Sequence, residues 1–339
     1  MEIKEALGRL VAKQDLDFEE MRSVTNDIMS GKVSNAQIGA FLVALRLKGE
    51  TTEEIAAAAT SMRQVATKVQ VGKNPLLDTS GTGGDGSNSF NISTASAFVV
   101  ASSGVSVAKH GNRAASGSSG SADLLEAAGA KIDLTPNQIN LCIEKFGLGF
   151  MFAPAHHKAT KHVFGPRREI GVRTIFNFLG PLTNPAGATN QLIGVFDIQW
   201  VEKLAHVLER LGTQRAMVVC SLGGMDEIAI DKPTRVAELR DGKIHTSEIN
   251  PEALGVSIQS HEHLIANSPD ASLNVITRVF EGTDGPALDI VSLNAGAAIY
   301  VGGSAKTLQI GVDTARDLLK SGNVLRHFRE FCKFTQTFS

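Results

Sequence analysis

Hydrophobic residues in the first 66 positions recur at the spacing of amphipathic helices. Ile3, Leu7, Leu10 and Val11 would share one face of a helix. Three later segments each open with a pair of residues at capping-box spacing, namely Asp17 with Glu20, Ser34 with Gln37, and Thr51 with Glu54. The pattern predicts four short helices over residues 3–66, with Gly31 and Gly49 at helix C-caps, and contains no strand candidate.

From residue 74 onward, short apolar runs alternate with helical patterns. The expected strands are NPLLD (74–78), VSVAK (105–109), AKIDL (130–134), LGFMF (148–152), LIGVF (192–196) and AMVVC (216–220). The expected helices between them cover residues 121–129, 135–147 and 200–212, and further helices are expected over 289–322. Residues 235–240 and 243–249 are expected to pair as a hairpin through Asp241 and Gly242. This alternation predicts an α/β fold with a mostly parallel central sheet flanked by helices.

The composition narrows the class of protein. The chain has 339 residues, of which 42% are hydrophobic and 20% charged, with a formal net charge of −2, so it can bury a large core and has no basic field for nucleic acid. The three cysteines have no metal-ligand spacing and are expected to be buried thiols in a reducing compartment: Cys142, Cys220 and Cys332. No apolar run approaches the ~20 residues that span a bilayer, and no signal peptide is evident. We therefore expect a cytoplasmic protein with no nucleic-acid or membrane partner.

The stretch from Asp78 to Ala122 carries two loops rich in Gly, Ser and Asn, which suggests a cradle for an anion. Its glycines at 81, 83 and 86 satisfy GxGxxG, but a dinucleotide site also needs an acidic residue at the end of the next strand. Lys109 and His110 stand there instead. A Walker A loop also fails, because Ser87 and Asn88 occupy the positions of its Lys and Ser/Thr.

The remaining interpretation is a phosphate site built from both loops. Backbone N–H groups of residues 83–86, and the start of a helix opened by Ser93 and Thr94, could face an anion. A carboxylate at Asp85 suits a ligand that also offers hydroxyls or a metal ion, such as a phosphorylated sugar with magnesium. The second loop adds Lys109 and the pair Asn112–Arg113 at a strand end, although a surface turn is the alternative.

Two later segments concentrate charge. Residues 154–173 are rich in His, Lys and Arg; His157 and His162 hint at a metal, but they lack the HExxH spacing of a zinc site, and a solvated basic helix face is the alternative. Adjacent Asp226 and Glu227 in GGMDEI suit either magnesium or an exposed acidic turn.

Five motifs together resemble those of the anthranilate phosphoribosyltransferase family. They are GTGGDG (81–86), FNIST (90–94), KHGNR (109–113) followed by GSAD (120–123), RTIFNFLGPLTNP (173–185) and GGMDEI (223–228). They occur in the family's order and cover roughly the whole chain. The resemblance implies a small helical domain, residues 1–68 with about 167–183, which forms homodimers. It also implies a larger α/β domain, residues 75–166 and 184–339, with an architecture shared with pyrimidine nucleoside phosphorylases.

The same resemblance implies that the protein transfers the phosphoribosyl group of phosphoribosyl pyrophosphate to anthranilate with Mg²⁺. The residues expected to bind phosphoribosyl pyrophosphate are Gly81, Gly84, Asp85, Ser89, Asn91, Ile92, Ser93, Thr94, Lys109, His110, Gly111, Asn112, Arg113, Ala114, Ala115, Ser116, Gly117 and Ser121. Those expected at anthranilate are Gly81, Asn112 and Arg167, and those at the metal are Ser93, Asp226 and Glu227. Catalysis is assigned to Lys109, Arg167, Asp226 and Glu227.

Three positions depart from the family's pattern. Ser89 replaces a usual Thr but keeps the hydroxyl, whereas Ala114 and Gly117 stand where Ser is common and offer no side-chain donor. Arg168 and Arg173 are interpreted as structural or dimer-facing. The alternatives are a nucleoside phosphorylase of the same architecture and a catalytically silent relative that binds nucleic acid, which would require a strongly basic surface and loss of the metal carboxylates.

Overall fold

A computed structural model describes residues 1–73, 75–114 and 117–338. Its N-terminal part is the expected set of helices: α1 (Ile3–Val11), α2 (Phe18–Met29), α3 (Asn35–Lys48) and α4 (Thr52–Val65). The three capping boxes are present at the starts of α2, α3 and α4. Gly31 and Gly49 follow α2 and α3 with φ of 74° and 92°, a backbone region that glycine enters without strain. The local signals in the sequence therefore placed these helices correctly.

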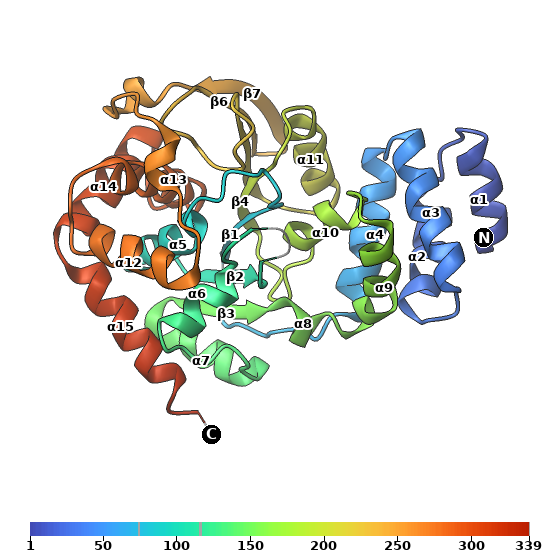
Figure 1. The fold of residues 1–339 in the computed structure, drawn as a ribbon, viewed down its shortest axis with the longest axis horizontal. Helices are drawn as coiled ribbons and strands as arrows, with labels where there is room; N and C mark the ends of the chain where they lie inside the picture. Colours follow the sequence, from blue (N-terminus) through green and yellow to red (C-terminus); the bar gives the residue numbers. More distant parts are fainter. Residues whose placement is uncertain (74, 115–116, 339) are drawn as a thin grey trace.

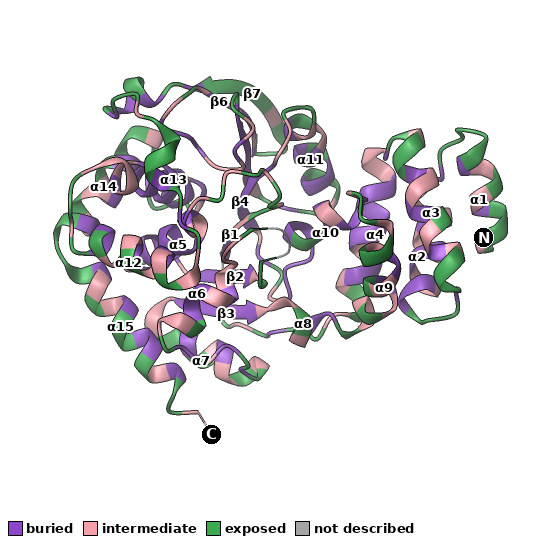
Figure 2. Ribbon diagram, viewed as in Figure 1, coloured by how far each residue is buried: buried purple, intermediate pink, exposed green. Residues whose placement is uncertain are grey.

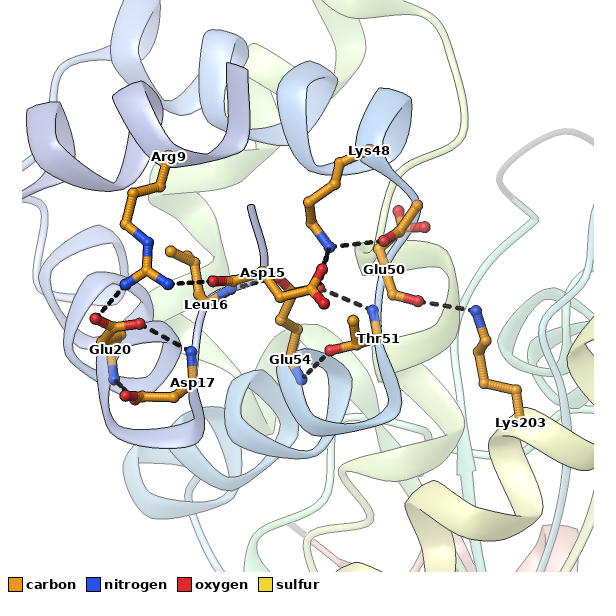
Figure 3. Close-up of polar contacts among 11 residues, drawn as sticks. Arg9, Asp15, Leu16, Asp17, Glu20, Lys48, Glu50, Thr51, Glu54 and Lys203 are labelled. Carbon is orange, nitrogen blue, oxygen red and sulfur yellow. Dashed lines mark hydrogen bonds and ion pairs between the residues drawn. The ribbon is translucent and has the colours of Figure 1, made fainter. Parts of the chain in front are cut away.

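The helices α1 to α4 form a helical module. A buried ion pair between two of them stabilises this module (Figure 3). The buried carboxylate of Glu54 accepts bonds from Lys48 Nζ at 2.9 Å and from the N–H of Leu16 at 3.0 Å. Lys48 also donates to Asp15 at 2.7 Å. Burial alone would lower the pKa of Lys48, but these hydrogen bonds raise it above its usual value. The end of α3 is thereby joined to the start of α4 and to the connection before α2.

The remaining chain forms a seven-stranded sheet with helices around it (Figure 1). The strands are β1 (Leu77–Gly81), β2 (Val107–Gly111), β3 (Leu148–Phe152), β4 (Asn190–Gly194), β5 (Arg215–Ser221), β6 (Thr234–Arg240) and β7 (Lys243–Ile249). The helices are α5 (Ile92–Ser102), α6 (Ser121–Ala127), α7 (Pro136–Phe146), α8 (Ala153–His156), α9 (Lys161–Ile170), α10 (Phe176–Leu182), α11 (Gln199–Arg210), α12 (Pro269–Phe280), α13 (Pro286–Val301), α14 (Leu308–Lys320) and α15 (Asn323–Thr335). Short 3₁₀ turns span Lys158–Thr160, Pro251–Leu254 and His261–Leu264.

The strand order is β3-β2-β1-β4-β5-β6-β7. Neighbours from β3 to β5 pair in parallel, and β6 and β7 add an antiparallel hairpin at one edge. Asp241 and Gly242 join the hairpin with φ of 52° and 68°, as a type I′ turn requires. The α/β fold with a mostly parallel sheet is confirmed, and each of these strands lies close to a predicted position.

The two faces of the sheet belong to different hydrophobic cores. Leu192 and Met217 belong to a core that also includes residues of α5, α13, α14 and α15. Their neighbours Ile193 and Val218 point the other way, into a second core that contains α11, α10 and the helical module. Figure 2 shows the central strands buried and β7 largely exposed. The helical module and one face of the sheet therefore share one continuous core.

One predicted strand was wrong. Residues 130–134 form no strand, although Ala130, Ile132 and Leu134 are buried as their alternation suggested. The segment packs on the end of α15, where Lys131 N–H donates to Thr335 Oγ1 at 2.9 Å. The alternating apolar pattern resembles that of a strand because tertiary packing buries every second residue of this irregular segment. No separate helices were predicted at the positions of α8, α10, α12 and α15, and Asn74, the first residue of the expected strand 74–78, lies outside the described residues.

Two further expectations concern the whole chain. Cys142, Cys220 and Cys332 are free and buried, as predicted. In the part of the chain that the structure describes, no helix combines the length and apolar character needed to cross a membrane.

Candidate functional site

The candidate site lies where the parallel strands β1, β2 and β4 end, because the loops that follow them all emerge at one edge of the sheet. Gly81 and Gly194, the last residues of β1 and β4, lie side by side in register. The turn that carries Asp226 packs directly on them: a Cβ at Gly81 would lie 2.4 Å from Asp226 Oδ2, and one at Gly194 would lie 1.6 Å from the main-chain oxygen of Asp226. Glycine at both positions lets the acidic turn reach the strand ends.

The first loop, residues 81–86, is hydrogen bonded to the acidic turn, which carries Asp226 and Glu227. Gly83 N–H donates to Asp226 Oδ2 at 2.8 Å, and Asp226 N–H lies 3.4 Å from Asp85 Oδ2. Burial, followed by the charge of Asp85, raises the pKa of Asp226 to about 7. Burial and the charge of Asp226 raise the pKa of Glu227 well above its usual value, against the opposing charge of Lys109. The structure thus gathers three predicted carboxylates in one place, where negative charge is crowded.

Lys109 reaches this group from the end of β2. Its side chain is buried, and Nζ donates to the carbonyl of Thr79 at 2.6 Å and to Ser93 Oγ at 3.3 Å. Burial lowers the pKa of Lys109, whereas the charges of Asp78 and Glu227 raise it. Lys109 therefore links the end of β1 to the first turn of α5, where the predicted metal ligand Ser93 lies.

Not all amides expected at the anion are available. The N–H of Gly83 is already bonded to Asp226. By contrast, the N–H groups of residues 84, 85 and 86 donate to no acceptor among the described residues. Gly84 has a φ of 74°, and its carbonyl accepts a hydrogen bond from Arg173. The available donors of the first loop therefore begin one residue later than the glycine pattern suggested.

The second loop is held mainly by its own helix. Arg113 pairs with Asp123 at 3.0 Å and with Glu126, and Ala114 N–H donates to Asp123 Oδ2 at 2.9 Å. Asn112 Oδ1 accepts the N–H of Arg113. Residues 112–114 and 117 are exposed, whereas the predicted site residues Ala115 and Ser116 lie outside the described residues. A Cβ at Gly111 would lie 2.7 Å from the Phe150 ring, so that glycine serves close packing.

Several predicted ligand-binding residues join the two loops to each other. Asn91 Nδ2 donates to the carbonyl of Ser119 at 3.0 Å, and Asn91 Oδ1 accepts from Ser119 Oγ at 2.9 Å and from Ser272 Oγ at 2.7 Å. Thr94 Oγ1 donates to Ser121 Oγ at 2.9 Å. Ile92 is buried at the start of α5. Ser272, fully buried on α12, was missed because no local pattern distinguishes it from other helical serines.

Ser89 follows the glycines of the first loop in the chain, and Ser87 Oγ donates to Ser89 Oγ at 3.3 Å. It forms an isolated antiparallel bridge with Ile265. Phe90 N–H donates to Leu264 O at 2.8 Å, and Ala266 N–H donates to Asn88 O at 3.0 Å. The segment 264–266, for which no role was predicted, therefore supports residues 88–90 beside the first loop.

A buried network below the strand ends was also missed. Asp78 is fully buried in β1 and accepts bonds from His110 N–H at 3.1 Å and Asn184 Nδ2 at 2.8 Å. Burial raises the pKa of Asp78 to about 6. Burial, and then the neighbouring His157, lowers the pKa of His110 to about 3, so its ring is neutral and bonds the carbonyl of Gly180 through Nδ1. The available signal was a lone Asp at the end of an apolar run.

Arg167 lies on α9, apart from the acidic group in the chain. It is partly buried, and its guanidinium carbon lies 5.4 Å from the centre of the Phe176 ring. Burial lowers its pKa. Among the described residues no carboxylate pairs with it, so its planar fork is open to an anionic group of a ligand.

The arrangement suits an anionic ligand that brings oxygen ligands for a hard cation. Within residues 1–73, 75–114 and 117–338, no group of three or more His, Cys, Asp or Glu is placed to hold a metal. Magnesium in phosphate sites commonly takes one or two protein carboxylates and completes its shell with phosphate oxygens and waters. The raised pKa values of Asp226 and Glu227 fit a place where a divalent cation would relieve repulsion.

Comparisons with known proteins cover the whole chain. Two family models match it, the glycosyl transferase family helical bundle domain over residues 4–66 and the a/b domain of the same family over residues 73–325. The anthranilate phosphoribosyltransferase of Marinobacter nauticus is 51% identical over 342 residues, with 100% of both chains covered. That of Thioalkalivibrio sulfidiphilus is 52% identical, with 99% of both chains covered.

Solved structures of the same enzyme are also similar to this chain. Anthranilate phosphoribosyltransferase from Thermus thermophilus superposes with a TM-score of 0.93 at 42% identity, covering 98% of this chain and 99% of that one. The Saccharomyces cerevisiae enzyme, solved in complex with phosphoribosyl pyrophosphate and Mg, has the same fold, with a TM-score of 0.90 at 23% identity over 99% and 98% of the two chains.

Proposed function

This chain belongs to the anthranilate phosphoribosyltransferase family, and we propose that the strand-end site described above is its active site. The enzyme transfers the 5-phosphoribosyl group of phosphoribosyl pyrophosphate to the amine of anthranilate and releases pyrophosphate, a step of tryptophan biosynthesis. The observation that carries the proposal is the meeting of Lys109, Ser93 and the carboxylates Asp226 and Glu227 at one edge of the sheet.

We propose that the donor, phosphoribosyl pyrophosphate, binds between the two loops. The N–H groups of residues 84–86, which have no acceptor among the described residues, and the N-terminus of α5 offer donors to phosphate oxygens. Asp85 would accept from ribose hydroxyls. The exposed residues 112–114 and 117 of the second loop would contact the pyrophosphate once Arg113 exchanges its carboxylate partners for phosphate. Asn91 and Thr94 contribute by holding the loops together.

We assign the Mg²⁺ of the reaction to Ser93, Asp226 and Glu227. When bound, Mg²⁺ supplies positive charge against the oxygens of the pyrophosphate. Asp226 is held in place by Gly83 N–H, and Glu227 lies within the field of Lys109. These residues would hold the cation together with oxygens of the donor, which agrees with the small number of carboxylates gathered there.

Catalysis then follows from position and charge. The amine of anthranilate attacks C1 of the ribose as the bond to pyrophosphate breaks, negative charge grows on the leaving group, and the amine loses one proton to water. Lys109 and the loop N–H groups stabilise that charge without a covalent intermediate. We place the carboxylate of anthranilate at Arg167, whose guanidinium has no carboxylate partner among the described residues. Gly81 and Asn112 complete the predicted acceptor site.

We also propose that the helical module, with about residues 167–183, forms a homodimer interface. The supporting observation is a pair of exposed apolar side chains on helices that pack together, Val11 on α1 and Leu47 on α3, which are 75% and 79% exposed. Light scattering of the wild-type protein and of Leu47→Glu tests this: a dimer that the substitution dissociates is expected. The buried free thiols support a further proposal, that the enzyme works in the reducing cytoplasm.

Loss of anthranilate fluorescence tests the function. Purified protein should deplete anthranilate only when phosphoribosyl pyrophosphate and Mg²⁺ are both present. Inorganic phosphate with a nucleoside serves as the control for phosphorylase activity and should give no reaction. Turnover of the nucleoside without turnover of anthranilate would contradict the proposal.

A further inference from the structure

Arg173 occupies a place that the proposed reaction does not explain. It lies between α9 and α10, yet its side chain reaches the first glycine-rich loop. Its guanidinium donates to the carbonyl of Gly84 and stacks on Phe196, with the guanidinium carbon 3.8 Å from the ring centre. No carboxylate of the described residues neutralises it.

The first loop has a glycine at the point where Arg173 approaches its backbone. Gly84 has a φ of 74°, and a Cβ at that position would lie 3.2 Å from Arg173 Nη2. A side chain at position 84 would therefore meet both backbone strain and the guanidinium. The glycine is needed for the approach of Arg173 as well as for the turn.

The direction of one peptide bond follows from this contact. In a trans peptide the C=O and the following N–H point in opposite directions. Because Gly84 O is turned toward Arg173, the N–H of Asp85 is turned away from it, and that N–H has no acceptor among the described residues. The contact therefore presents a free donor on the side of the loop opposite to Arg173.

A group of aromatic side chains supports Arg173 through its contact with Phe196. Phe196 stacks on Phe178 with ring centres 5.6 Å apart, and Phe178 meets Trp200 at 4.0 Å. Lys203 on α11 lies 4.7 Å from the Trp200 ring and donates to the carbonyl of Glu50 at 2.9 Å, as Figure 3 shows for the last contact. A stack of rings thus runs from the connection between α3 and α4 to the guanidinium. An arginine immobilised in this way loses little entropy when it bonds the loop.

We propose that Arg173 is a positioning residue that fixes the 84–85 peptide of the first loop, so that the Asp85 N–H is preset toward a phosphate of the donor. The inference rests on the proposed function only for the identity of that ligand. The competing role is direct contact between Arg173 and the donor, in which the guanidinium would act as a charge and not as a support for the loop.

The test combines hydrogen exchange with kinetics in Arg173→Ala and Arg173→Lys. Arg329→Ala, which removes an exposed arginine from α15, is the matched control. In the free enzyme, Arg173→Ala should speed exchange in the peptide covering residues 82–90, where the N–H groups of Thr82, Gly83 and Ser87 are hydrogen bonded. It should also raise the KM for phosphoribosyl pyrophosphate about 10- to 100-fold, as expected for loss of a hydrogen bond to a charged group, and leave the KM for anthranilate nearly unchanged.

The lysine variant separates the two roles. Lysine keeps the charge but lacks the planar fork that stacks on Phe196 and bonds the carbonyl, so a positioning role predicts that Arg173→Lys behaves like Arg173→Ala. Unchanged exchange in Arg173→Ala would overturn the proposal, and a raised donor KM in that case would mean direct contact. Faster exchange with an unchanged donor KM would support the positioning role and refute the assignment of the loop to the donor. If Arg173→Ala does not fold, Phe196→Leu should give a smaller change of exchange in the same direction.

Discussion

Gly194→Ala tests how the acidic turn is seated. The added Cβ would lie 1.6 Å from the main-chain oxygen of Asp226, whereas ordinary contacts begin at 3.4 Å, so the two must separate by about 1.8 Å. Gly194 is a central residue of the sheet, paired with Gly81 and Val219. The strand is therefore the more rigid partner, and the turn that carries Asp226 and Glu227 is expected to move.

A displacement of this size is large for a metal site. Shifts of about 1 Å in a positioned catalytic group lower rates by roughly 100-fold, and overpacking of a core costs about 1–3 kcal/mol of stability. We therefore expect Gly194→Ala to stay folded, to lower kcat about 100-fold, and to raise the Mg²⁺ concentration that gives half-maximal activity.

The assay follows anthranilate fluorescence at saturating donor while Mg²⁺ is varied, with the urea midpoint measured in parallel. Gly8→Ala is the control, because a Cβ at Gly8 on α1 meets no atom within 4 Å. A Gly194→Ala protein that loses stability but titrates with Mg²⁺ like the wild type would contradict a displaced acidic turn, as would an equal loss of activity in Gly8→Ala.

Three further results are expected. Arg167→Ala should raise the KM for anthranilate about 10- to 100-fold and the KM for phosphoribosyl pyrophosphate far less, because the guanidinium is assigned to the carboxylate of anthranilate. Steady-state kinetics with each substrate varied measure both KM values. Equal rises in the two KM values would count against the assignment. The double variant Asp226→Asn with Glu227→Gln should shift or abolish the Mg²⁺ dependence, so an unchanged titration curve would remove these residues from the metal site. Burial lowers the pKa of His110 to about 3 and of His157 to about 4, below the ~6.5 of an unfolded histidine, so the unfolded state binds more protons below pH 6.5. Stability should fall between pH 6.5 and pH 5 by up to about 2 kcal/mol per group, and urea titrations of His157→Gln should show a shallower fall.

Local signals in the sequence predicted most of the fold. Capping boxes at Asp17, Ser34 and Thr51 identify helix starts because both hydrogen bonds of each box lie within four residues. The turn at Asp241 and Gly242 is equally local. The segment 130–134 shows the limit: its alternating burial comes from α15, which lies about two hundred residues later, and no local pattern separates that origin from a strand.

The candidate site likewise contains features that the local sequence could predict and features that it could not. Lys109 could be predicted as part of a binding site from its residue type and its position after an apolar run, whereas Asp226 and Glu227 also suited an exposed acidic turn and were assigned to the metal through the family resemblance. Gly83 could not be excluded as an anion donor, because its N–H is taken by Asp226, which follows it by more than one hundred residues. Ser272 and Arg173 were missed as supports of the first loop for the same reason: their roles exist only through contacts between distant segments.

A crystal structure with phosphoribosyl pyrophosphate and Mn²⁺ in place of Mg²⁺ tests the proposed active site most directly. The anomalous signal locates the cation independently of the fitted protein atoms. We expect a Mn²⁺ peak within coordination distance of Ser93, Asp226 or Glu227, with the 5-phosphoribosyl group lying between the loops 81–86 and 109–121. A Mn²⁺ peak and donor bound elsewhere, with these side chains unchanged, would contradict it.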